Sequence, residues 1–297
     1  MIDWLKYKKI YFSISIGLIA VCIYALFAWG LKLGVDFRGG TIIEYKFTEE
    51  ISTEEATKKI EDAGLEVTSV QKTGDGTYIF KLPPINVYEK GLIKEELTGL
   101  IGEEIDELRF ETVGPSMGPE LVKKTAYAIV ISAGVMLLWI AYQFKNFKFG
   151  ISAILAMFHD SFILIGSFAI LGHFMSAEVD FLFVTALLTT LSFSIHDTIV
   201  VFDRIREIKK KHGGEMVDVA NRALTETMVR SLNNSFTIAF MLMALLLLGG
   251  TTVKWFAAAL LIGTILGTYS SPFVATPLLI SWDSVIEKIK SIKLKRF

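Results

Sequence analysis

Six long apolar stretches constrain this chain more than any other feature of its sequence. They lie at about 10–30, 124–142, 150–172, 181–202, 228–250 and 254–280. Each is about as long as the roughly 20 residues that a helix needs to cross the hydrocarbon core of a bilayer. The chain is 52% hydrophobic with a mean hydropathy of +0.51, too apolar for an ordinary soluble domain. The sequence therefore predicts an α-helical integral membrane protein with six transmembrane helices.

The Lys and Arg residues of the short loops predict how these helices are oriented. They gather before the first span, in every second loop and after the last span, and comprise Lys6, Lys8, Lys9, Lys145, Lys148, Arg204, Arg206, Lys209, Lys210, Lys211, Arg222, Lys288, Lys290, Lys293, Lys295 and Arg296. On the other side, "HFMSAEVD" has none and "GGTTVK" has only Lys254. We therefore expect a multi-pass protein of the cell (inner or plasma) membrane, in contact with its lipids, with both termini in the cytoplasm. The first span is expected to be an uncleaved anchor rather than a signal peptide, because no A-x-A cleavage pattern follows it.

The long loop between the first two spans, residues 31–122, is predicted to be a small extracytoplasmic domain. Its expected elements are a strand at 41–47, a helix at 52–64, a hairpin of 65–73 and 77–82 around Gly74-Asp75-Gly76, a helix at 86–101 and a strand at 107–113. A capping box of Ser52 and Glu55 is expected to open the first helix, and Gly64 to end it. The order β-α-β-β-α-β predicts an α+β, ferredoxin-like domain. It contains no recognisable nucleophile–base set or phosphate-binding loop, which favours a binding or coupling module over an enzyme.

These features divide the chain into four parts. The parts are a cytoplasmic N-terminus with the first helix (1–30), the extracytoplasmic domain (31–122), the remaining five transmembrane helices (123–281) and a basic cytoplasmic tail (282–297). Within the third part, residues 203–227 carry charges at helical spacing between apolar positions. This pattern predicts one or two amphipathic helices along the membrane surface.

Two Gly- and Pro-rich segments connect the domain to the membrane. "GVDFRGGT" (34–41) follows the first span and "VGPSMGPEL" (113–121) precedes the second. Their candidate joint residues are Gly34, Asp36, Arg38, Gly39, Gly40, Gly114, Pro115 and Gly118. Such residues permit tight turns and close backbone approach, but they also occur in plain linkers, and both interpretations stay open.

Ionisable residues inside the apolar stretches are the candidate functional groups. His159 and Asp160 lie in the third span, His196 and Asp197 in the fourth, and Arg230 opens the fifth. Supporting polar residues in these spans are His159, Ser194, Thr198, Asn233 and Asn234. Ionisable groups at such depths should face the bundle interior or a wet cavity and pair with one another.

We predict that Asp197 pairs with Arg230. The pair could be a fixed structural lock, or it could form a proton relay together with Asp160 and His196. Stability alone is a weak reason to keep a buried ion pair, which favours the relay. A metal site is not expected, because adjacent His and Asp residues on a helix point about 100° apart. Cys22 is the single cysteine, which excludes an intramolecular disulfide and a thiolate metal site.

Taken in order, these motifs resemble the SecF family of the Sec protein-export machinery. The resemblance rests on "GVDFRGGT", "VGPSMGPEL", the "HD" of the third span, "SFSIHDTIVVFDRIRE" and "RSLNNS". It implies a subunit of RND-superfamily design that works with a SecD-like partner and the SecYEG translocon. Such a subunit uses the proton-motive force to draw a translocating preprotein across the membrane. It also implies that Asp197 and Arg230 take part in proton passage, and that Asp160 occupies the family's His-Asp position.

His196 departs from the Asn that the family often has before the fourth-span Asp. It adds either a second titratable group or a neutral, hydrogen-bonded ring. Two other functions remain: an RND-type exporter of a small molecule or lipid, and a scaffold that stabilises the translocon without transport. The formal net charge of −1 gives no reason to expect nucleic-acid binding, and no cofactor is expected.

Overall fold

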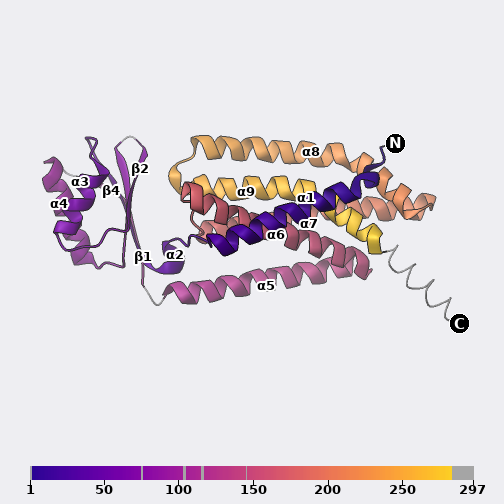
Figure 1. Ribbon diagram of the computed structural model, residues 1–297, viewed down its shortest axis with the longest axis horizontal. Coiled ribbons are helices and arrows are strands. Elements are labelled where there is room, and N and C mark those ends of the chain that lie inside the picture. Colours follow the sequence, from indigo (N-terminus) through magenta and orange to yellow (C-terminus); the bar gives the residue numbers. More distant parts are fainter. Residues whose placement is uncertain (1, 75, 103–104, 115–116, 145, 283–297) are drawn as a thin grey trace.

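Long helices and a small antiparallel sheet form two parts that lie end to end (Figure 1). The computed structural model describes residues 2–74, 76–102, 105–114, 117–144 and 146–282. Its elements are η1 (Trp4–Tyr7), α1 (Lys8–Ala28), α2 (Val35–Arg38), β1 (Gly40–Lys46), α3 (Thr53–Asp62), β2 (Ser69–Gly74), β3 (Thr77–Leu82), α4 (Val87–Ile101), β4 (Asp106–Val113), α5 (Met117–Phe144), α6 (Phe147–Met175), α7 (Phe181–His212), α8 (Met216–Leu248), α9 (Thr251–Ser270) and a π-helical segment η2 (Ser271–Ala275). Within the described residues, six helices are long and apolar enough to cross a membrane, and they coincide with the six predicted spans.

The sheet part has the predicted ferredoxin-like topology. Its strands run in the order β2-β3-β1-β4 and all neighbours are antiparallel, while α3 and α4 cover one face (Figure 1). In β1, Ile43 and Tyr45 are fully buried between less buried neighbours, which is the period-2 alternation of a strand with one face on a core. On α4, Ile93 and Leu97 lie one turn apart and complete that core.

The helix caps of this domain differ from the prediction in one respect. Ser52 does precede α3, but its hydroxyl donates to the Glu54 carboxylate (2.7 Å) and makes no cap bond to the backbone. The predicted capping box of Ser52 and Glu55 is therefore wrong. A capping box opens α4 instead, where Asn86 accepts from Glu89 N and the Glu89 carboxylate accepts from Asn86 N. Asn supplies the same acceptor as Ser at this position.

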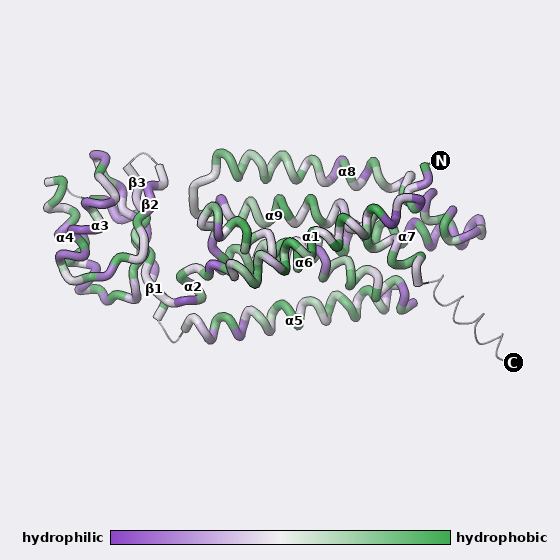
Figure 2. Tube along the Cα trace, viewed as in Figure 1, coloured by the Kyte–Doolittle hydropathy of each residue, from purple (hydrophilic) through white to green (hydrophobic). Residues whose placement is uncertain are grey.

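The membrane part is layered around α6, α7 and α9. In α6 and α7, half of the residues of the most apolar stretch are buried inside the protein, and in the sixth span two thirds are. In α5 and α8 the buried share is only 6%. In Figure 1, α8 lies along one side of the bundle and α5 along the opposite side, while α1 packs on α6. Figure 2 shows hydrophobic residues along the length of these helices, so the outward faces of α5 and α8 suit lipid or another apolar helix.

Small residues allow the central helices to approach closely. Gly263 and Gly267 of α9 form a G-x-x-x-G pattern that faces Thr190 and Ser194 of α7. A Cβ atom on Gly263 would lie only 2.0 Å from Thr190 Cγ2. Helix pairs in membranes gain stability mainly from such close backbone packing, because lipid is as apolar as the side chains.

The charged segment between the fourth and fifth spans forms no separate surface helices, and that prediction is wrong. Residues 203–212 continue α7 and residues 216–227 open α8, leaving only 213–215 as the connection. The apolar positions of this segment, such as Ile205 and Val219, are buried between the two helices and not in lipid. Both helices therefore extend beyond the apolar zone as a helical hairpin.

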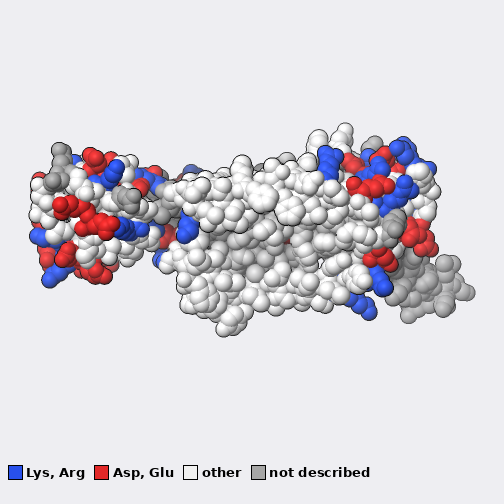
Figure 3. Space-filling view, turned by 90° about the horizontal axis from the view of Figure 1, so that it is seen from above, with Lys and Arg blue, Asp and Glu red and all other residues white. Residues whose placement is uncertain are grey.

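Charged side chains lie at both ends of the molecule, with a band nearly free of them between (Figure 3). One charged end is the sheet domain. The other, which we call the basic end of the bundle, comprises η1, the start of α6, the α7–α8 hairpin and the last described turn before Trp282. Basic residues outnumber acidic ones there.

The sixth span is irregular at Pro272. The helix changes from α9 to the π-helical segment η2 at Ser271–Ala275 and then resumes as far as Trp282. A proline cannot donate the backbone hydrogen bond of a regular helix and displaces the preceding turn. The predicted basic cytoplasmic tail, apart from Trp282, lies outside the described residues.

The close packing of α7 on α9 predicts the effect of a single methyl group. Gly263→Ala gains about 1 kcal/mol of helix propensity but forces the new Cβ into Thr190, and overpacking costs about 1–3 kcal/mol. Because Thr190 is β-branched and stiff, we expect the overpacking to dominate and the thermal midpoint in detergent to fall. Gly134→Ala on α5, where a Cβ meets nothing within 4 Å, is the matched control and should leave the midpoint unchanged or raise it. Equal midpoints for the two variants would contradict the close contact.

Candidate functional site

Asp160 is the most enclosed carboxylate of the membrane part and joins three helices. Its side chain is 7% exposed. Oδ2 accepts hydrogen bonds from Ser194 Oγ of α7 (2.6 Å) and from Ser270 Oγ of α9 (2.5 Å), and Oδ1 lies 2.9 Å from His159 Nδ1. Each carboxylate oxygen thus has a partner, as burial in an apolar bundle requires. The partners are neutral hydroxyls and an imidazole, and none is Lys or Arg.

Asp197 lies one turn further along α7 from Ser194 and serves a second interface. Its Oδ2 accepts from Ser231 Oγ of α8 (2.7 Å), and its side chain is 14% exposed. Beside it is a cavity of about 10 Å³ lined by Asn234, Ser235, Thr264 and Thr268 among others. That is the lower limit of the space that one water molecule occupies, and the lining offers several polar partners. Asp197 therefore borders a small polar cavity among α7, α8 and α9.

The predicted ion pair of Asp197 with Arg230 is wrong for this structure. Among the ion pairs of the described residues, none joins these two side chains, and Arg230 is exposed. Arg230 lines a larger cavity at the basic end together with Asp203 and Glu226. The reason is helical geometry: successive residues point about 100° apart, so α8 cannot direct both Ser231 and Arg230 at Asp197.

The other intramembrane candidates divide into buried and outward-facing residues. Thr198 is buried and bonds to Ser271 of η2 (2.9 Å), so it belongs to the interior. The His196 side chain is 69% exposed and its Nδ1 is 4.0 Å from Asp197 Oδ1, while Asn233 and Asn234 are also exposed. His159 Nε2 is buried with no hydrogen-bond partner among the described residues, and the ring borders an apolar cavity of about 570 Å³.

Four hydroxyl residues of this site were not predicted. Ser231, Ser270, Ser271 and Thr268 supply partners to the two carboxylates and to their neighbours, for instance through the Thr268–Ser235 bond of 2.6 Å. The sequence did hold a signal for two of them, because Ser270 and Ser271 interrupt an apolar helix about one turn after the G-x-x-x-G pattern. The two His-Asp pairs do not combine into a ligand set, and the described residues hold no group of three or more His, Cys, Asp or Glu that could bind a metal.

At the opposite end of α7, the joint segment contacts the helix directly. Asp36 Oδ2 accepts from Phe181 N (2.9 Å), and Asp180 Oδ1 accepts from Phe183 N (2.8 Å). Two carboxylates thus satisfy free amides of the first turn of α7, where the helix dipole favours negative charge. The strand-like segment beside them pairs through Gly34 N to Val179 O (2.9 Å) and Val179 N to Lys32 O (2.8 Å).

Several glycines of the joint fit close backbone approaches. Gly39 and Gly40 have positive φ values of 79° and 145°. A Cβ on Gly118 of α5 would lie 2.5 Å from Phe37 O of α2. Gly34 is buried by its pairing, whereas Arg38 is exposed and Gly114 lies in open space. Pro115 lies outside the described residues.

A salt bridge that the sequence did not indicate ties the sheet to the membrane part. Lys81 Nζ of β3 lies 2.7 Å from Glu178 Oε1 in the α6–α7 loop, and the two side chains are 15% and 19% exposed. Glu178 and Asp180 of this loop, Asp36 of α2 and Lys81 of β3 thus bring three carboxylates and one lysine together. The pKa of Asp180 is raised mainly by burial, and further by the charges of Asp36 and Glu178.

Comparisons with known proteins agree with this architecture. Residues 93–285 match the family model of the protein export membrane protein SecD/SecF, C-terminal, and residues 24–51 match that of the SecD/SecF GG motif. The protein translocase subunit SecF of Thermobaculum terrenum is 40% identical, over 96% of this chain and 95% of that protein. The chain belongs to the SecF family.

Solved structures of SecDF proteins are also similar to this chain. The crystal structure of SecDF from Thermus thermophilus, described as a translocon-associated membrane protein, matches with a TM-score of 0.82 and 29% identity. The match covers 95% of this chain but only 39% of that one. A SecDF structure in a super-membrane-facing form matches with a TM-score of 0.72. The "GVDFRGGT" segment falls within the GG-motif match.

The hydroxyl partners of Asp160 predict a stability effect at one atom. Ser270→Ala leaves Oδ2 with one partner fewer in a closed site, which costs about 1–3 kcal/mol. We expect a lower thermal midpoint in detergent. Ser192→Ala, an exposed serine on α7, is the control and should leave the midpoint within error. If both variants matched the wild type, the bond between Ser270 and Asp160 would carry no stability.

The environment of Asp180 predicts a pH dependence of stability. Its folded-state pKa is raised, so the free energy of unfolding gains its contribution below the unfolded pKa of about 3.9 and loses it as the pH rises through the folded pKa. Asn caps helices as well as Asp does, and it does not titrate. Lowering the pH from 7 to 4 should therefore stabilise the wild type relative to Asp180→Asn. Thermal unfolding of both proteins at the two pH values tests this, and a difference in midpoint that stays constant would refute it.

Proposed function

We propose that this chain works with a SecD-type partner as the SecF subunit of the Sec translocase and couples proton movement to preprotein export. The SecDF relatives, in which both subunits are one chain, are the basis for the partner. The SecYEG translocon and a translocating preprotein follow from the same family relation. We further propose that both termini face the cytoplasm, because the basic end of the bundle carries the excess of Lys and Arg.

The observation that carries the proposal is the pairing of Asp197 with a hydroxyl instead of a cation. A carboxylate locked to Arg stays charged, and the lock is a structural device. Asp197 instead has Ser231, which can accept or donate a hydrogen bond, and so can partner the acid in either protonation state. The adjacent polar cavity of about 10 Å³ offers room for one water as a proton carrier.

Asp160 is the second acid of the proposed relay. Ser194 lies one turn before Asp197 on α7 and bonds to Asp160, so the two acids share one helix as their frame. A change of charge at either acid alters hydrogen bonds that α7 makes with α8 or with α6 and α9. Each proton that crosses supplies about 2.3 kcal/mol per 100 mV, which is comparable to one or two such bonds.

Arg230 has a conditional role in this proposal. Arg230 is next to Ser231 on α8. If α8 rotated and the long Arg230 side chain turned inward, Arg230 would replace Ser231 as the partner of Asp197. In the arrangement with Arg230, Asp197 would release its proton, because a nearby cation favours the charged acid.

Replacing the central acid tests the proposal. Asp197→Asn keeps the size of the side chain but cannot exchange a proton, so the gradient-dependent part of late preprotein translocation should fall to the level measured without a gradient. The assay uses membrane vesicles that contain the complete translocase, with and without a proton gradient. ATP-driven initiation, which needs no gradient, should stay the same.

Asp203→Asn is the matched control on the same helix. Asp203 is partly exposed at the basic end and lies 3.7 Å from Arg206, outside the polar interior. It should keep gradient-dependent export. Undiminished gradient-dependent export by Asp197→Asn would reject the relay and favour a scaffold that stabilises the translocon.

A further inference from the structure

A cavity at the basic end of the bundle has no place in the proton relay. Its volume is about 860 Å³, and it lies where the first turn of α6, the end of α7, the start of α8 and the last turns of the sixth span meet. The volume is in the range of sites that bind small molecules or headgroups. The elements that surround it are the points at which apolar helices give way to charged ones (Figure 2). The cavity therefore lies at the level of the membrane surface.

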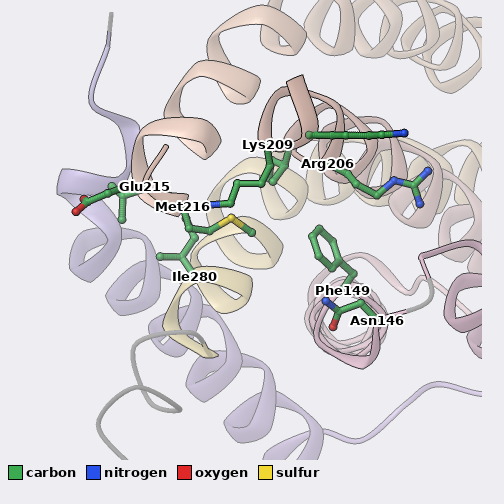
Figure 4. Close-up of a pocket in the computed structure, with 10 residues that line it drawn as sticks. Asn146, Phe149, Arg206, Lys209, Glu215, Met216 and Ile280 are labelled. Atoms are coloured by element: carbon green, nitrogen blue, oxygen red, sulfur yellow. The ribbon is translucent and has the colours of Figure 1, made fainter. Parts of the chain in front are cut away.

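One wall of the cavity is cationic. In Figure 4, Arg206 and Lys209 of α7 lie along one side, and Asn146 at the N-terminus of α6 lies across from them. Lys210 also lines the cavity, is exposed and has no ion-pair partner among the described residues. Among the described residues of the lining, Glu215 is the one acid, and its carboxylate points away from the cavity (Figure 4). The described lining thus has an excess of positive charge.

The cations keep this charge because their local partners are weak or neutral. Arg206 donates to the Gln143 carbonyl (3.1 Å) and is 3.7 Å from Asp203, and Lys209 donates to the Gly214 carbonyl (2.5 Å). A neighbouring cavity shares Arg206 and Lys210, but its lining also contains Asp203, Glu207 and Glu226. There Arg204 pairs with both Glu207 and Glu226, so most of its charge is compensated. The first cavity has the larger excess of positive charge and suits an anion better.

Part of the lining is apolar, which restricts the kind of anion. Phe149 of α6, Met216 of α8 and Ile280 of the sixth span line it (Figure 4). A free inorganic anion gains nothing from such a wall, whereas a molecule with a phosphate at one end and hydrocarbon at the other contacts both. We propose that this cavity binds an anionic phospholipid of the surrounding leaflet, with its phosphate toward Arg206 and Lys210 and its glycerol and upper acyl chains along Phe149 and Ile280. Basic pockets between transmembrane helices are a general mode of anionic lipid binding.

Native mass spectrometry of the full-length protein in detergent tests the site. The protein is titrated with phosphatidylglycerol and, in parallel, with phosphatidylcholine of the same acyl chains. Arg206→Gln/Lys210→Gln removes two cations worth about 1 kcal/mol each at a membrane surface, so the affinity for phosphatidylglycerol should fall about thirtyfold. The affinity for phosphatidylcholine should be low and unchanged.

The control removes the same charge from the same end but outside the cavity. Lys211→Gln/Arg222→Gln removes two exposed cations. Their carboxylate partners, Glu207 and Glu226, remain paired with Arg204. It should lose less than threefold in affinity. If the double variant of the cavity fails to fold, Lys210→Gln alone should lose about fivefold.

Three outcomes would overturn the proposal. One is an equal loss in the cavity variant and the control, which means general surface attraction. Another is equal affinity of the wild type for phosphatidylglycerol and phosphatidylcholine, which means that the cavity does not select an anionic lipid. The third is displacement of phosphatidylglycerol by millimolar inorganic phosphate, which means a free-anion site. The test is independent of the relay, because Asp197→Asn should bind phosphatidylglycerol as the wild type does.

Discussion

The membrane part depends on one constraint: a carboxylate placed among apolar helices must find all its hydrogen-bond partners inside the protein. Asp160 meets this requirement with Ser194 of α7 and Ser270 of α9, and therefore sets how these helices lie against α6. The hydroxyls reach the acid only if the helix backbones approach closely. The glycines of α9 make that approach possible at Thr190 and Ser194. The close packing of α7 on α9 and the hydrogen bonds of Asp160 thus depend on each other.

The same helices carry two acids with different surroundings. Asp160 is closed off by partners on three helices, whereas Asp197 has one side-chain partner on α8 and a small polar cavity beside it. A site that is fully satisfied holds a structure in place, and a site with a free position can exchange a partner. In the proposed relay, Asp197 is therefore the acid that can exchange partners, whereas Asp160, the second acid, also holds α6, α7 and α9 together.

Local patterns in the sequence predicted the helices and strands well. They could not predict how the helices are rotated against one another or which distant residues meet. Runs of about 20 apolar residues identify spans directly, and the strand and helix order of 31–122 predicts the ferredoxin-like sheet. The rotation of a helix about its axis depends on its neighbours, so the choice between Ser231 and Arg230 as the partner of Asp197 could not be made from spacing. Lys81 and Glu178 are 97 positions apart, and nothing local links them. Residues 203–227 have an amphipathic pattern that fits a membrane surface and a helical hairpin equally, and tertiary packing selected the hairpin.

The continuity of α7 has a mechanical consequence. Its 32 residues span about 48 Å, at 1.5 Å per residue, without a proline or a break. One end is hydrogen-bonded to Asp36 of the joint, the middle carries Ser194 and Asp197, and the far end holds Arg206 at the lipid-facing cavity. A stiff rod does not absorb an axial displacement between its ends. The sheet domain, the intramembrane acids and the basic end of the bundle are therefore mechanically in series, and an axial shift at one of them must be accommodated at the other two.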